Sequence, residues 1–175
     1  MSTHQIIEKV LLDKRDLLKK DYNTYRNHVY RVFHLCLLLD NATGNADKYA
    51  IASIFHDIGI WTDLTFDYLK PSIAKAQEYL QKTGSGEWEE EVSLMIDMHH
   101  KLSSYKGPYE QTVETFRRAD WIDVTKGVLK FGLEKKEIAT VLKAFPALGF
   151  HAFLLKQSTK NFFKHPLNPL PMFKK

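Results

Sequence analysis

Apolar residues recur at intervals of three and four positions along most of this 175-residue sequence. The segment IIEKVLLDKRDLLKK at positions 6–20 is typical, because its charged residues confine the apolar ones to one side of a helix. No alternating run is long enough to indicate a β-strand, and we find no internal repeat and no interdomain linker. The pattern therefore predicts an all-α protein, a single-domain helical bundle spanning residues 1–175.

Glycine, proline and asparagine divide this periodic pattern into separate helices. Gly59 is expected to end one of them and Pro71 to open the next, because proline suits the first helical turn. The stretch between these two residues is aromatic and irregular. The expected helices cover 6–20, 25–40, 46–59, 71–83, 87–100, 114–129, 135–145 and 151–164.

Positive charge is concentrated in the last third of the chain. Residues 1–125 contain 15 Lys and Arg against 19 Asp and Glu, whereas residues 126–175 contain 10 Lys against 2 Glu. Such a region suits nucleic acid, an acidic lipid surface or a phosphorylated substrate, although a solvated lysine surface is the simplest interpretation. We divide it into a helical extension, 126–165, and a proline-containing tail, 166–175, which Leu167, Leu170 and Phe173 are available to pack against the body.

The chain carries a single cysteine, Cys36, which therefore cannot form an internal disulfide. Cys36 lies in an apolar run and is interpreted as a small buried hydrophobic residue rather than a nucleophile. No apolar stretch reaches about 18 residues, so no transmembrane helix is expected. The N-terminal segment is amphipathic and charged, unlike a signal peptide. We expect a cytoplasmic protein, and nothing in the sequence sets its oligomeric state.

Histidine and aspartate interrupt four of the apolar helical segments. They are His28, the doublet His56–Asp57, the pair His99–His100, and Asp120. An ionised aspartate inside a bundle costs several kcal/mol unless a positive group compensates it. A divalent metal ion does so directly, and imidazole with carboxylate ligands suits Mn, Fe, Zn, Co, Ni and Mg. Adjacent residues on a helix are about 100° apart, so both members of the doublet can face one ion.

In their order and context, these four elements resemble the HD-domain superfamily of metal-dependent phosphohydrolases. His28 stands three residues before Arg31–Val32, the doublet lies in ASIFHDIG, and Asp120 follows an alanine. The resemblance covers about 24–125 and implies a helical bundle of the HD-domain type.

The resemblance assigns roles residue by residue. His28, His56, Asp57 and Asp120 would hold the metal, with Asp57 also orienting or deprotonating water. His99 and His100 would contact the phosphate or support a second ion. Because residues 58–98 contain no histidine, we expect one tightly bound divalent ion.

Other residues near these motifs are interpreted one by one. His34 competes with His28 as first ligand but lacks the Arg-Val context, so it is expected to pack in the interior. Trp121 is also expected in the core, and Asp123 is expected to orient a ligand histidine. Trp61 suits either the pocket mouth or a plug at the bundle end. Candidate contacts to a phosphorylated substrate are Arg31, Trp61, Lys70, Lys101 and Arg118.

The implied reaction is hydrolysis of a phosphate ester of a nucleotide or other small molecule, with water activated by the metal. Because HDIG is followed by Ile60 rather than lysine, the cyclic-dinucleotide branch is disfavoured. Two alternatives stay open at this point. One is oxygenase or hydratase chemistry on the same fold. The other is a non-catalytic module that binds nucleic acid or membrane through the basic C-terminal region, with nucleic acid not favoured.

Overall fold

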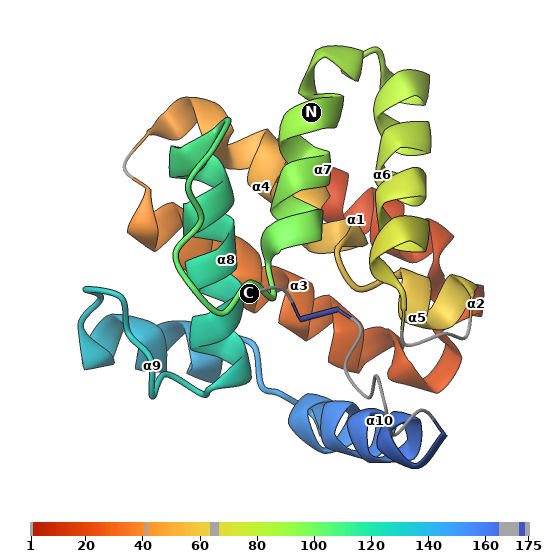
Figure 1. Ribbon diagram of the computed structural model, residues 1–175, viewed down its shortest axis with the longest axis vertical. Coiled ribbons are helices and arrows are strands. Elements are labelled where there is room, and N and C mark those ends of the chain that lie inside the picture. Colours follow the sequence, from red (N-terminus) through yellow and green to blue (C-terminus); the bar gives the residue numbers. More distant parts are fainter. Residues whose placement is uncertain (1, 41, 64–66, 165–171, 174–175) are drawn as a thin grey trace.

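The chain folds into a bundle of α-helices around a shared apolar core (Figure 1). This computed structural model describes residues 2–40, 42–63, 67–164 and 172–173, and these residues contain no β-strand. In chain order the elements are α1 (Thr3–Asp13), α2 (Arg15–Leu18), η1 (Lys19–Asp21), α3 (Tyr22–Leu39), η2 (Thr43–Asn45), α4 (Ala46–Phe55), α5 (Gly59–Thr62), α6 (Leu69–Thr83), η3 (Gly86–Trp88), α7 (Glu89–Met98), α8 (Glu110–Val124), α9 (Lys135–Ala144) and α10 (Phe150–Lys164).

Helix α3 is the central element of the bundle. It packs against α4, α8 and α9, while α7 contacts both α4 and α8 (Figure 1). Most residues along α3 are buried, including Tyr25, Val29 and Cys36. Burying such a helix removes much apolar surface from water, which is the main favourable contribution to folding. The prediction of an all-α helical bundle is confirmed, and Cys36 is a buried hydrophobic residue as expected.

The predicted helix over 6–20 is two helices and a turn of 3₁₀ helix. Helix α1 begins at a capping box, in which the Ser2 hydroxyl accepts from the Gln5 backbone and the Gln5 side chain accepts from Ser2 N–H. It ends at Asp13, and Lys19 adopts a positive φ of 49°. This left-handed conformation is unfavourable for lysine, so local conformational preference does not explain the turn at Lys19.

The helix predicted to end at Gly59 ends instead at Phe55, and Gly59 begins α5. The reason is the close approach of α6. A Cβ atom on residue 59 would lie 2.5 Å from the carbonyl oxygen of Tyr68, and the Gly59 N–H donates to Ser72 Oγ at 3.0 Å. His56 and Asp57 therefore lie in the turn between α4 and α5, which frees their side chains from the direction of a continuous helix.

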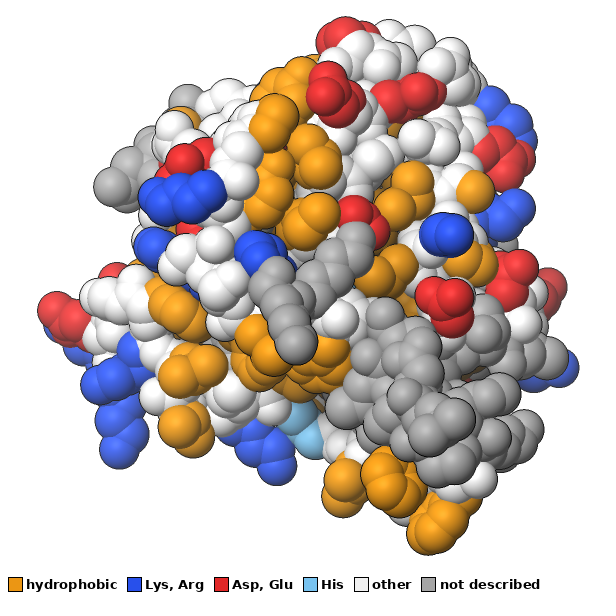
Figure 2. Space-filling view, in the orientation of Figure 1, with side chains coloured by type: hydrophobic (Ala, Val, Ile, Leu, Met, Phe, Trp, Pro, Cys, Tyr) orange, Lys and Arg blue, Asp and Glu red, His pale blue; other side chains and the backbone are white. Residues whose placement is uncertain are grey.

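The basic extension forms α9 and α10, which lie along α3 on the lower side of the bundle in Figure 1. Lys130 and Lys143 are exposed there, as a solvated basic surface requires. Figure 2 shows hydrophobic side chains at the lower edge of the molecule, over α10, where Phe162 and Phe163 are exposed. Leu167 and Leu170 of the tail lie outside the described residues. No helix in the described part of the chain is long and apolar enough to cross a membrane.

Candidate metal centre

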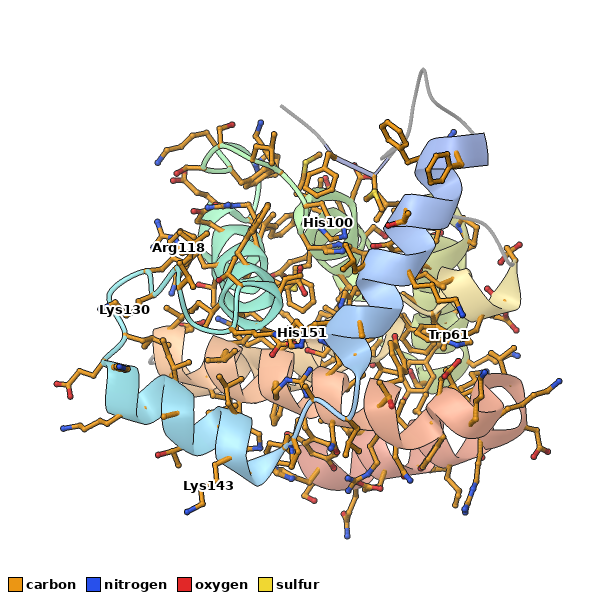
Figure 3. All side chains as sticks on the ribbon, turned by 90° about the horizontal axis from the view of Figure 1, so that it is seen from below. Trp61, His100, Arg118, Lys130, Lys143 and His151 are labelled. Atoms are coloured by element: carbon orange, nitrogen blue, oxygen red, sulfur yellow. The ribbon has the colours of Figure 1, made fainter. Side chains whose placement is uncertain are left out.

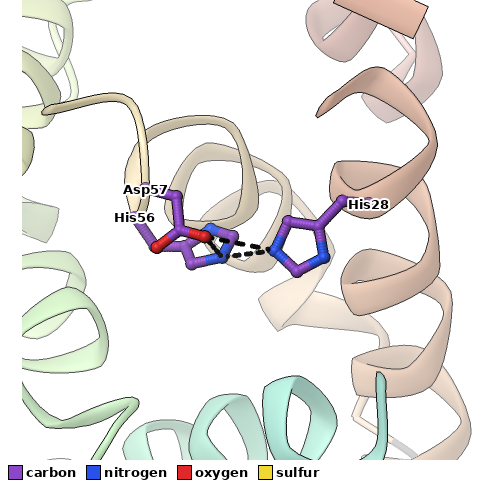
Figure 4. A group of neighbouring side chains, drawn as sticks. All are labelled: His28, His56 and Asp57. Carbon is purple, nitrogen blue, oxygen red and sulfur yellow. Dashed lines mark hydrogen bonds and ion pairs between the residues drawn. The ribbon is translucent and has the colours of Figure 1, made fainter. Parts of the chain in front are cut away.

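Four side chains from different parts of the sequence meet in the interior of the bundle. His28 comes from α3, His56 and Asp57 from the turn after α4, and Asp120 from α8. All four are almost completely buried. The two Nε2 atoms of His28 and His56 are 2.8 Å apart, and Asp57 Oδ2 lies 3.5 Å from each (Figure 4). Asp120 Oδ1 lies 3.8 Å from His28 Nε2 and 3.7 Å from His56 Nε2.

These separations match the spacing of atoms around one metal ion. Ligand atoms at about 2.1 Å from a metal are about 3.0 Å apart in octahedral geometry and about 3.4 Å apart in tetrahedral geometry. The two ring nitrogens are 2.8 Å apart and the nitrogen–oxygen distances are 3.5–3.8 Å, so the observed separations bracket those values. His28, His56 and Asp57 form a group that can hold a metal ion. The structure thus brings together the four residues predicted as ligands.

Hydrogen bonds to the other ring nitrogens orient three histidines of the cluster. His28 Nδ1 lies 2.7 Å from Asp123 Oδ2, His56 Nδ1 2.9 Å from the Ser53 carbonyl, and His99 Nδ1 2.6 Å from the Ile96 carbonyl. A carbonyl or carboxylate oxygen only accepts, so each Nδ1 carries the proton. The Nε2 atoms of all three rings therefore face Asp57, and a ring in its neutral form presents a lone pair there, as metal-binding histidines do.

The charges of the cluster are unevenly distributed. Burial disfavours the charged form of His28, but hydrogen bonds to Asp123 and Asp57 raise its pKa to about 9. Burial and the charges of neighbouring imidazoles lower the pKa of His56 to about 3. The protonated Nε2 of His28 therefore donates to the lone pair of His56 Nε2. A dication would take up both lone pairs and displace this proton.

Three buried polar atoms at this cluster have no hydrogen-bond partner among the described residues. They are Asp57 Oδ1, His99 Nε2 and Asp120 Oδ2. An unsatisfied buried polar group costs about 1–3 kcal/mol, and more when it is charged. Burial also raises the pKa of Asp120 to about 6. A cation among these atoms would satisfy them, so the donor set fits the divalent metal ion predicted from the sequence.

A second group of possible ligands shares Asp57 with the first. Asp57, His99 and His100 each offer an atom within range of a common ion, and His99 Nε2 lies 3.6 Å from Asp57 Oδ1. His100 is already engaged, because the Tyr68 hydroxyl donates to its Nε2 over 2.6 Å. Burial and the neighbouring His99 keep the pKa of His100 well below its usual range. Because the Tyr68 hydroxyl already binds His100 Nε2, this second group is less available to a metal ion than the first.

Arg31, predicted as a substrate contact, is engaged by protein groups in the structure. Its side chain is fully buried behind the cluster. Nε and Nη2 bind the two carboxylate oxygens of Asp123, and Nη1 donates to the Phe145 carbonyl. The guanidinium is therefore used to hold Asp123 against His28. The sequence could not show this, because the ion pair joins α3 to α8 only in the folded bundle.

Two of the other predicted substrate contacts are held by structural interactions. Trp61, which is labelled in Figure 3, packs on Tyr25 with ring centroids 4.8 Å apart, and its indole N–H donates to Asp21. This supports its interpretation as a plug at the bundle end. Arg118 is paired with Glu114, with Nε 2.8 Å from Oε1.

The remaining two predicted contacts are lysines. Lys101 is half-buried, and its carbonyl accepts from Arg117 and Trp121. Lys70 is exposed in the first turn of α6.

Two aromatic predictions have different outcomes. His34 lies outside the cluster, stacked on Phe145 with centroids 5.2 Å apart, and is a packing residue as expected. Trp121 is only half-buried, so its predicted place in the core is wrong. It follows Asp120 on α8, and the helical period turns its side chain about 100° away from the interior.

Several neighbours of the cluster have no signal in the sequence. The Phe150 ring stacks on His28 with centroids 3.9 Å apart, and Phe173 stacks on His100 at 5.2 Å. The bond between Tyr68 and His100 also joins distant segments. Aromatic residues are frequent in this chain, and only tertiary structure selects those that reach the cluster.

An all-α bundle with a buried histidine and aspartate cluster defines a class of helical metal-binding proteins. The family model of the HD domain matches residues 25–125, more than half of the chain, and the chain belongs to this family of metal-dependent hydrolases. No curated protein and no solved structure matches the chain.

Proposed function

We propose that this protein hydrolyses a phosphate ester of a nucleotide or another small molecule in the cytoplasm. In this proposal His28, His56, Asp57 and Asp120 hold one divalent ion tightly. One observation carries the proposal: in a buried site, carboxylate oxygens of Asp57 and Asp120 lie 3.5–3.8 Å from two imidazole nitrogens that are themselves 2.8 Å apart. Three other polar atoms there, Asp57 Oδ1, His99 Nε2 and Asp120 Oδ2, have no partner among the described residues.

When bound, a divalent ion in this site supplies an acidified water and polarises a phosphoryl oxygen. Asp57 is placed to orient that water, because Oδ2 faces the His28–His56 pair and Oδ1 faces His99. Its pKa is lowered below the usual range, against the effect of burial, by the surrounding imidazoles, so it is ionised. An ionised carboxylate accepts the hydrogen bond of a water molecule and fixes its direction.

His99 and His100 are proposed to act on the phosphate side of the reaction. Burial disfavours a charge on His99, but the Asp57 carboxylate, 3.6 Å from Nε2, raises its pKa. A protonated His99 can donate to a phosphoryl or leaving-group oxygen through Nε2. His100 receives the Tyr68 hydroxyl at Nε2 and holds Nδ1 4.0 Å from Asp120 Oδ2. It is suited to position substrate rather than to bind a second metal ion.

The substrate's negative charge also requires a cation outside the ligand set. Arg31 and Arg118 pair with carboxylates, and we keep Lys70, which is exposed in the first turn of α6, as the candidate. Lys70 stands exposed two residues after Tyr68, at the end of α6 that lies near the cluster. A small phosphorylated molecule is favoured over nucleic acid, because the chemistry is buried deep between helices.

The proposal is tested by elemental analysis of the purified protein, followed by a panel of phosphate monoesters and diesters assayed with the metal found. Asp57→Ala should lose both metal and hydrolysis while keeping its helical circular dichroism. Asp63→Ala, an exposed change in the same region, serves as control. Full hydrolysis by Asp57→Ala would overturn the proposal. Tightly bound iron without turnover of any ester would instead indicate oxygenase-type chemistry.

A further inference from the structure

Two residues that follow α10 lie over the outer side of the candidate site. We call Met172 and Phe173 the covering pair. Met172 is 3% exposed and packs in a small apolar cluster with Ile60, Tyr68 and Leu69, separate from the main core. Figure 3 shows the end of the described chain passing beside the labelled His100.

Phe173 makes the more direct contact with the site. Its ring stacks on the His100 imidazole with centroids 5.2 Å apart and planes inclined by 29°, and it lies 6.1 Å from the Trp121 ring. The His100 side chain is 14% exposed, whereas His99 is completely buried. His100 is therefore the outermost histidine of the site, and Phe173 lies on it.

The two members of the covering pair are held unequally. Met172 is buried against Tyr68, the residue whose hydroxyl binds His100. Phe173 keeps 36% of its surface exposed. A stacked aromatic contact of this kind changes an equilibrium only about threefold to tenfold. The ring can thus be displaced by another planar group at little cost, while Met172 keeps the segment in place.

We propose that the covering pair is autoinhibitory. Phe173 occupies the face of the His100 ring that lies beside Trp121, which we call the platform, and an aromatic group of the substrate stacks on this same face. This inference rests on the proposed function and narrows it to phosphate esters that carry a planar aromatic group, such as a nucleobase or an aryl ring. Such a group competes with Phe173 for the platform. A substrate without one leaves Phe173 in place and reaches the site less often.

The occupation of the platform is tested without any turnover. Full-length protein with matched metal content is treated with diethyl pyrocarbonate, and modification of His100 is followed by tandem mass spectrometry. Phe173→Ala should raise the rate at which diethyl pyrocarbonate modifies His100 about threefold to tenfold, because the ring that covers His100 is removed. Phe163→Ala changes an exposed phenylalanine of α10 and should react like the unmodified sequence. Met172→Ala is a second variant that should loosen the same cover.

The aromatic preference is tested with two non-hydrolysable probes, phenylphosphonate and methylphosphonate. The concentration of phenylphosphonate that protects His100 from diethyl pyrocarbonate should be about threefold to tenfold lower in Phe173→Ala than in the unmodified sequence. The protecting concentration of methylphosphonate should differ less between the two proteins.

The inference is overturned if His100 is modified at an unchanged rate in both Phe173→Ala and Met172→Ala. It is also overturned if phenylphosphonate protects His100 equally well in Phe173→Ala and in the unmodified sequence. If the modification and protection results are as expected but no phosphate ester is hydrolysed, the cover by Phe173 and its aromatic preference are supported and the proposed hydrolysis is wrong.

Discussion

His28 Nδ1 donates a hydrogen bond to Asp123 Oδ2 over 2.7 Å, and Arg31 holds the same carboxylate from the other side. The arrangement fixes the ring of His28 so that Nε2 faces His56 and Asp57. Burial raises the pKa of Asp123, but its bonds to His28 and Arg31 outweigh this effect and hold its pKa at about 2. Asp123 therefore stays ionised and makes His28 a stronger ligand.

Asp123→Asn should weaken metal binding about 10-fold to 100-fold, because the amide keeps the shape but loses the charge that orients His28. Calorimetric titration with Mn²⁺ or Zn²⁺ measures the change. Asp13→Asn, an exposed aspartate of α1, is the matched control and should bind as before. Unaltered affinity in Asp123→Asn would show that the carboxylate serves the fold alone.

The sequence predicted most of the site because its ligands stand in short local motifs. His28, the doublet and Asp120 carry their context within a few residues, and helical periodicity places His28 and Asp120 on the inner faces of α3 and α8. The contacts of Arg31 could not be predicted in the same way. A cation beside a ligand histidine suits both a substrate phosphate and a buried carboxylate, and only the packing of α3 on α8 decides between them.

Helix ends were the least predictable part of the fold. The pattern around Gly59 indicated a helix end, but the glycine is required by the backbone of Tyr68, which lies in another segment. The cover by Phe173 likewise depends on a contact between distant residues. Periodicity describes which side of a helix is buried, and it does not describe what lies against that side.

Metal binding at neutral pH should release about one proton from His28. The pKa of this residue is about 9, so at pH 7 the ring is protonated and a cation must displace the proton from Nε2. Affinity should therefore rise about tenfold per pH unit up to about pH 9 and level off above it. Calorimetry in buffers of different ionisation enthalpy measures the proton count. A count of zero at pH 7 would contradict the assigned state of His28.

Gly59→Ala should destabilise the fold by about 1–3 kcal/mol, because the added methyl group meets backbone that has to move. Its Cβ would lie 2.5 Å from the Tyr68 carbonyl oxygen and 3.1 Å from Pro71 Cβ. Gly44→Ala is the control, since a Cβ there meets nothing within 4 Å. Its effect should stay within about 0.5 kcal/mol. Urea denaturation of the two variants gives the comparison, and equal midpoints would mean that α5 and α6 separate without cost.

Ser53→Ala and Ser72→Ala should change stability in opposite directions, although both serines are fully buried. Ser53 Oγ has no hydrogen-bond partner among the described residues, so its removal should stabilise the protein by about 0.5–2 kcal/mol. Ser72 Oγ accepts from the Gly59 N–H, so its removal leaves a buried donor unpaired and should cost about 1–3 kcal/mol.

Thermal unfolding of the two serine variants separates these outcomes, at about 2–4 °C per kcal/mol for a chain of this size. The metal content of Ser53→Ala should be unchanged, because His56 Nδ1 bonds to the Ser53 carbonyl and not to its hydroxyl. A loss of metal in Ser53→Ala would instead place the hydroxyl in the binding site. A shift of the same sign in both variants would show that burial alone, and not hydrogen bonding, sets the stability at these positions.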